Sequence, residues 1–218
     1  MTLINTYDYK IPKIWFHKIK GVQDVATLKE LEIANKLSRQ RANIFLESRA
    51  YIRKSLGNFF KVNPLEMPII ANPGKPPELP NGMGYFSFSH CSDAIILVWH
   101  EKKIGIDIER LDRDFDYEKL AKKYFFNSNK SNNSSEIYKK SILNQWCAVE
   151  AAIKWDHGKL AKDIKEWQYS ENEKTLFHKK KKLKLKFTQI TFYKWTFSLA
   201  YKDSSHFMPN IICSSGIV

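Results

Sequence analysis

The stretch Gly105-Ile106-Asp107-Ile108-Glu109 decides how this chain is interpreted, because apolar and acidic residues alternate along it. Successive side chains of a β-strand point to opposite faces, so the alternation predicts a strand with both carboxylates on one face. Ile106 and Ile108 are then expected on the other face. In a chain of formal net charge +13, neighbouring acids call for a specific reason, and a metal with a phosphorylated substrate would supply one.

A third acid, Glu150, occupies a segment with helical spacing. Trp146, Glu150 and Lys154 are four residues apart, so we expect them on one face of a helix. Carboxylate oxygens are the ligands that hard divalent cations prefer, and Asp107, Glu109 and Glu150 therefore form a candidate Mg2+ site. On spacing alone, Glu150 with Lys154 also fits an exposed helical ion pair, and the two strand acids also fit the polar face of an edge strand.

Composition limits the class of protein. The chain has 218 residues, of which 43% are hydrophobic and 14% aromatic, as expected for a globular protein. The basic balance predicts an anionic partner: nucleic acid, a membrane surface, a phosphorylated cofactor or an acidic protein. Three cysteines without paired spacing indicate neither a disulfide framework nor a zinc motif. Without an apolar signal core or a membrane-spanning run, we expect a cytoplasmic protein.

Local periodicity predicts the order of the elements. The expected elements are helices within 27–60, a Pro/Gly-rich loop at 72–84, a strand at 85–90, and a hairpin of strands 94–99 and 104–109. They continue with a helix at 116–126, a mobile loop at 127–135, a helix ending near 155, a turn at 178–182, and strands at 183–187 and 192–201. Strands joined mainly by hairpins favour the α+β class, and a hairpin with a helix in each half suggests a pseudo-duplicated architecture.

Four short segments, in this order, resemble the motifs of the larger, single-chain 4'-phosphopantetheinyl transferases, the surfactin-synthetase-activating type. They are Gly74-Lys75-Pro76, Phe86-Ser87-Phe88-Ser89-His90, Gly105–Glu109 and Trp146–Lys154. The resemblance implies a monomer of two similar halves, each an antiparallel sheet packed with helices, with the active site between them. The halves are expected at residues 1–105 and 106–218, the second carrying the metal-binding carboxylates.

The resemblance also implies an activity, that of a holo-[acyl-carrier-protein] synthase. Such an enzyme transfers the 4'-phosphopantetheine arm of coenzyme A to a serine of an acidic apo acyl or peptidyl carrier protein. The reaction releases 3',5'-ADP and depends on Mg2+, with Mn2+ as an alternative. The carrier supplies the nucleophile, so no serine of this chain has to attack. Neither membrane nor nucleic acid is an expected partner.

Within that activity, the resemblance assigns Asp107, Glu109 and Glu150 to the metal and Glu150 to proton acceptance. An unperturbed glutamate titrates near ~4.3, so Glu150 is expected to be ionised at neutral pH. Lys154 is expected to contact a phosphate and to balance the carboxylates, which makes Glu150, Asp107 and Lys154 the catalytic residues.

Coenzyme A is expected to contact a further set of residues. Ser89 and His90 are assigned to its nucleotide portion, with His90 near the 3'-phosphate, and Lys75 to the nucleotide end. Basic residues of the helix before the motifs are candidates for additional phosphate contacts, or else solvated surface residues: Arg41, Arg49 and Arg53.

Two positions depart from the family pattern. Val149 stands where a lysine usually precedes the helical glutamate, and Cys147 stands where small polar residues are common. The first departure keeps open an inactive relative that binds coenzyme A or a carrier without transfer. The lysine cluster at 178–186 keeps open a nucleic-acid-binding protein, although that alternative leaves the three acids unexplained.

Overall fold

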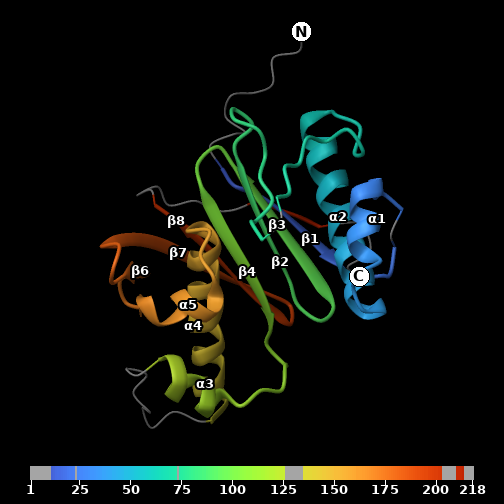
Figure 1. Ribbon diagram of the computed structural model, residues 1–218. Helices are drawn as coiled ribbons and strands as arrows, with labels where there is room; N and C mark the ends of the chain where they lie inside the picture. The colour runs from blue at the N-terminus through green and yellow to red at the C-terminus, as the bar shows by residue number, and fades with distance from the viewer. Residues whose placement is uncertain (1–10, 23, 73, 126–134, 203–209, 214–218) are drawn as a thin grey trace.

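The computed structural model describes residues 11–22, 24–72, 74–125, 135–202 and 210–213. Two β-sheets pack face to face between two groups of helices (Figure 1). The apolar layer between the sheets contains isoleucines from both, among them Ile14, Ile96, Ile106 and Ile108. The predicted α+β class is therefore confirmed, with two mainly antiparallel sheets.

The first sheet has the strand order β2-β3-β1-β9. Its strands are β1 (Lys13–Lys18), β2 (Tyr85–His90), β3 (Ala94–His100) and β9 (Asn210–Cys213). β9 runs parallel to β1, and the other pairs are antiparallel. The helices α1 (Leu28–Ala34) and α2 (Arg39–Phe60) accompany this sheet, and apolar side chains of α2 pack on its outer face.

The second sheet has the order β4-β8-β7-β6-β5. Its strands are β4 (Ile104–Arg110), β5 (Trp167–Ser170), β6 (Thr175–His178), β7 (Leu183–Phe192) and β8 (Trp195–Tyr201). The helical segments on this side are α3 (Tyr117–Tyr124), α4 (Ser135–Trp155), α5 (Leu160–Asp163) and the 3-10 turn η2 (Ile164–Glu166). The central helix α4 buries its apolar face against β6, β7 and β8. None of the helices described is both long and apolar enough to cross a membrane.

The predicted hairpin between 94–99 and 104–109 is wrong, although both segments are strands. β3 pairs with β1 and β2 in the first sheet, whereas β4 pairs with β8 in the second. The even-numbered apolar side chains of β3 and β4 meet across the sheet-to-sheet layer. The turn between them therefore passes from one sheet to the other. The loop predicted for 127–135 lies outside the described residues, except for Ser135.

The expected boundary between residues 105 and 106 falls inside β4. Strand β9, from the second half of the sequence, joins the sheet of the first half. The chain thus crosses between the sheets twice, once at β4 and once before β9.

The edge strands β2 and β4 run side by side where the two sheets meet, and we call this line the seam. The backbone N–H of Ile106 donates to Ser87 Oγ across it at 3.2 Å. One residue further along β4, the side chain of Asp107 reaches Ser89 of β2. The seam therefore brings the second and third sequence motifs into contact.

Gly105 allows α4 to lie directly on β4. A Cβ atom at this position would overlap the carbonyl oxygen of Ala151 and lie 2.7 Å from the backbone nitrogen of Trp155. The helix that carries Glu150 and Lys154 is thereby held against the strand that carries Asp107.

We expect Gly105→Ala to lower the free energy of unfolding by about 3 kcal/mol, since α4 must move away from β4. Gly74→Ala is the control, because its Cβ would meet nothing within 4 Å and only its positive φ of 71° is strained. That strain costs about 1–2 kcal/mol. Urea unfolding of both variants measures the difference, and equal losses would contradict the close approach of α4.

Candidate functional site

Asp107 is the centre of the site. Its side chain is buried, with the residue only 2% exposed. Oδ1 accepts hydrogen bonds from Ser89 Oγ and from Lys154 Nζ, each at 2.7 Å. Oδ2 is also buried, and no hydrogen-bond partner reaches it among the residues described. A buried carboxylate oxygen without a donor is costly, which makes Asp107 a candidate for binding a ligand.

Glu109 and Glu150 lie close enough to Asp107 for the three charges to interact. Burial, followed by the charge of Asp107, raises the pKa of Glu109, while Arg113 opposes this shift with its Nη1 2.5 Å from Glu109 Oε1. Burial, followed by Asp107, raises the pKa of Glu150 to about 8, although Lys154 lowers it. The expectation of an ordinary, ionised Glu150 is therefore wrong, because the helix places this carboxyl among two other acids with little access to water.

Lys154 connects the carboxylates to the rest of the site. Its ammonium group neutralises part of the charge of Asp107 and it also lines the adjacent cavity. His90 ends β2 beside this pair, and burial, followed by the positive charge of Lys154, lowers the pKa of His90. The structure thus brings Ser89, His90, Asp107 and Lys154 together, as the sequence predicted, at one end of the seam.

Buried polar contacts join α4 to the strands of the second sheet. The thiol of Cys147 donates to the backbone carbonyl of Asp107, at 3.2 Å, and burial raises the pKa of this thiol. Gln189 Nε2 donates to the backbone carbonyl of Asn144 at 3.2 Å and to Ser198 Oγ at 3.1 Å. Val149 lies on the face of α4 that is buried in the core. A lysine at this position, as in the family pattern, would therefore not have an exposed side chain.

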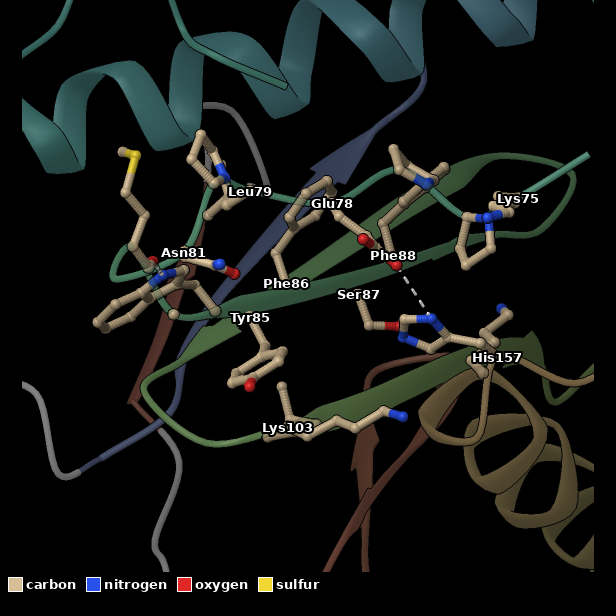
Figure 2. Close-up of a pocket in the computed structure, with 18 of the residues that line it drawn as sticks. Lys75, Glu78, Leu79, Asn81, Tyr85, Phe86, Ser87, Phe88, Lys103 and His157 are labelled. Atoms are coloured by element: carbon tan, nitrogen blue, oxygen red, sulfur yellow. Dashed lines mark hydrogen bonds and ion pairs between the residues drawn. The ribbon is translucent and has the colours of Figure 1, made fainter. Parts of the chain in front are cut away.

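A cavity of about 1140 Å3 adjoins this group of residues. The loop at 74–84 forms one wall, β2 and the start of β4 form another, and the end of α4 closes one side (Figure 2). Aromatic side chains contribute an apolar wall that includes Tyr85, Phe86 and Trp99. Such a cavity has the size and mixed lining of a cofactor site.

Three lysines contribute positive charge to the cavity, Lys75, Lys103 and Lys154. His157 lines it as well, together with two acids, Glu78 and Glu101. Lys103 and His157 are close enough to affect one another: burial and then Lys103 lower the pKa of His157. The predicted residues Lys75 and Lys154 therefore share one cavity, and its charge suits an anionic ligand.

Sequence reasoning missed three cavity residues, Glu78, Lys103 and His157. Lys103 lies in the turn before β4, and His157 follows the end of α4 with a positive φ of 55°. The sequence offered one indication of a binding role, namely that these residues lie in turns next to predicted strands and helices. Loops carried on rigid elements often bind ligands.

The basic residues of α2 occupy different environments. Arg53 is 6% exposed and is held by Glu30, through Nε at 3.0 Å, and by the carbonyls of Pro64 and Met67. Arg49 lies over the rings of Phe45 and Phe88, with a buried Nη1 that lacks a partner among the described residues. Arg41 is exposed near the start of the helix. Of the described residues that line the cavity, none is an arginine.

Among the residues described, no group of three or more His, Cys, Asp or Glu side chains converges closely enough, as it stands, to hold a metal ion. Asp107, Glu109 and Glu150 are coupled through their charges without forming such a group. Compared with known proteins, the chain matches no protein-family model, and no curated protein matches its sequence.

Arg53 provides a test of the structural role of its ion pair. We expect Arg53→Met to lower the free energy of unfolding by about 3–5 kcal/mol, because Glu30 would remain buried without its cation. Urea unfolding measures this loss, and Arg41→Met is the exposed control from the same helix. If Arg53→Met leaves stability unchanged and weakens only ligand binding, the structural assignment is wrong.

The raised pKa of Glu150 predicts a pH-dependent stability. The folded chain keeps a proton that the unfolded chain releases above pH ~4.5, so this stabilisation is lost as pH rises towards ~8. In EDTA, we expect Glu150→Gln to be more stable than the unsubstituted chain at pH 8.5, by about 2 kcal/mol. The advantage should shrink towards pH 5. Urea unfolding at both pH values measures it, with Glu136→Gln as the exposed control on α4. Parallel pH profiles would contradict the shift.

Proposed function

We propose that this chain transfers the 4'-phosphopantetheine arm of coenzyme A to a serine hydroxyl of an acidic apo carrier protein, releasing 3',5'-ADP. The observation that carries the proposal is the meeting of residues from all four sequence motifs. Asp107 bonds directly to Ser89 and Lys154, and Lys154 shares a cavity with Lys75. Residues that are distant in sequence thus meet through Asp107, and Lys154 connects them to the cavity that Lys75 also lines.

The chemistry of the three acids, Asp107, Glu109 and Glu150, suits a divalent cation. Asp107 Oδ2 has no donor among the described residues, and the pKa values of Glu109 and Glu150 are raised by burial and by Asp107. Clustered hard carboxylate oxygens whose negative charge is only partly compensated suit Mg2+ or Mn2+. Asp107, Glu109 and Glu150 would hold the ion, which when bound supplies positive charge to the diphosphate of the substrate.

The residues of the chain have separate duties in this proposal. Lys154 presents its ammonium group to the diphosphate from the side that faces the cavity. Ser89 holds Asp107 in place through its hydroxyl. Glu150 accepts the proton of the carrier serine, because a carboxylate positioned beside the reacting hydroxyl can act as a general base. The reaction then needs no nucleophile from this chain.

The competing nucleic-acid interpretation depends on the lysine cluster. Lys180 pairs with Glu166, Lys181 with Asp156, and Lys184 with Glu173. Because each of these lysines is next to an acid, the cluster presents less net positive charge than its sequence suggests. The cavity with its three lysines favours a small anionic cofactor over an extended nucleic acid.

The proposed transfer is tested with coenzyme A, Mg2+ and a panel of acidic apo carrier proteins. Intact-mass analysis should show a carrier that gains the mass of one phosphopantetheine arm, and none of this gain in EDTA. Glu150→Ala and Asp107→Asn should each reduce the rate by about 100-fold or more, since each removes a charge at the reacting diphosphate.

Glu136→Ala, an exposed acid on the same helix α4, is the matched control and should keep the full rate. Circular dichroism should show that all variants remain folded. If no carrier in the panel gains mass although the chain binds coenzyme A, the inactive-relative interpretation replaces the proposed activity.

A further inference from the structure

The turn that joins β2 to β3 is bonded to the second sheet through a carboxylate that the proposed reaction does not use. Asp93 lies in this turn, and its Oδ2 accepts a hydrogen bond from Arg110 Nη1, at the end of β4, at 2.8 Å. Its Oδ1 accepts a hydrogen bond from Trp195 Nε1, at the start of β8, at 2.9 Å. We call these three residues the seam lock, because they join a turn of the first sheet to two strands of the second.

Further donors surround the same residue. Lys194 Nζ lies 3.6 Å from Asp93 Oδ2, and the thiol of Cys91 donates to Oδ1 at 3.6 Å within the turn. The backbone carbonyl of Asp93 accepts a hydrogen bond from the N–H of Ile19, the residue after β1, at 2.9 Å. Hydrogen bonds between charged groups are stronger than neutral ones. The turn is therefore fixed to the ends of three strands that are distant in the sequence.

Contacts across the seam occur at three successive levels, which advance in the same direction along both strands. In order along β2 and the turn after it, they join Ser87 to Ile106, Ser89 to Asp107, and Asp93 to Arg110. Of these three contacts, the last is the ion pair. Ser89 lies between the other two levels, so its position against Asp107 depends on both of them.

Arg110 extends the connection to the side of the site that contains Glu109. Its Nη2 donates to Asp112 Oδ2 at 2.6 Å, and its backbone carbonyl accepts a hydrogen bond from the N–H of Arg113 at 3.3 Å. The side chain of Arg113 pairs in turn with Glu109. The same arginine that binds the turn after β2 thus also orders the residues that follow Glu109.

We propose that Asp93 is a positioning residue, which closes the end of the seam and thereby sets Ser89 against Asp107. Asp93 is not among the described residues that line the cavity, so it acts through the placement of other groups. The lock is a property of the fold, whereas its consequence for coenzyme A rests on the proposed function. Two measurements separate these statements.

Hydrogen exchange at the Ile106 amide tests the lock without any ligand, because this N–H is bonded across the seam to Ser87 Oγ. Asp93→Asn keeps the size of the side chain and removes the charge that Arg110 and Trp195 bind. The Ile106 amide should then exchange about tenfold faster, since opening of the seam no longer has to break these contacts.

Asp112→Asn is the matched control, because it removes the other carboxylate that binds Arg110 and leaves Asp93 in place. Asp112 is half exposed, so exchange at Ile106 should stay within about twofold of the unsubstituted chain. Arg110→Gln opens the lock from the side of β4 and should accelerate exchange as Asp93→Asn does. It also supplies the test if Asp93→Asn does not fold.

Transfer kinetics test the consequence for the site. Lys154 and Glu150, which act on the reacting groups in the proposed function, lie on α4, whereas Ser89 is expected to contact the nucleotide portion of coenzyme A. Asp93→Asn should therefore raise KM for coenzyme A by about tenfold and leave kcat within about twofold. A variant that merely loses folded protein would show a lower kcat with an unchanged KM.

Unchanged exchange at Ile106 in both lock variants would overturn the lock, and a lower kcat at constant KM would reduce Asp93 to a structural residue. Acceleration by Asp112→Asn as large as that by Asp93→Asn would also overturn the proposal. If the unsubstituted chain neither binds coenzyme A nor modifies a carrier, the proposed function fails. Hydrogen exchange alone then decides whether Asp93 closes the seam.

Discussion

The site depends on the carboxylate of Asp107, because this group accepts hydrogen bonds from residues of both halves of the fold. Ser89 reaches it from the edge of the first sheet, and Lys154 reaches it from the helix that covers the second. The face-to-face packing of the sheets sets β2 beside β4, and the missing side chain of Gly105 lets α4 come near enough for Lys154 to make its contact. Packing that buries isoleucines on one face of β4 thus creates a polar site on its other face.

Two kinds of buried charge occur in this chain, and they differ in how completely they are satisfied. The Arg53–Glu30 pair has matched charges and several further hydrogen bonds, as expected for a group that holds α1, α2 and the following loop together. The acids around Asp107 instead oppose one another, and one oxygen has no donor among the described residues. Folding alone gives no reason to keep such a cluster, whereas the proposed binding of a cation and a phosphorylated substrate would supply one.

Periodicity was sufficient to predict β4 and α4, since each repeats an unambiguous pattern. It also predicted on which face of the strand Asp107 lies and on which face of the helix Glu150 lies. It could not predict that β4 leaves β3 for β8, because two apolar strands joined by a short turn look the same whether they pair or separate. From the sequence alone, Arg53 resembles a surface residue, because its partner Glu30 lies on a separate helix. Glu78, Lys103 and His157 lie in turns, and their meeting depends on tertiary structure that no local pattern records.

Strand β9 joins β1 although the two lie near opposite ends of the sequence. The first sheet is therefore finished by a segment that leaves the ribosome after all of the second sheet. A nascent chain can pair β1, β2 and β3 early, but the outer edge of β1 stays open until β9 has been synthesised. Such an open edge favours pairing with other chains, so β9 protects the first sheet from misassembly once it is in place.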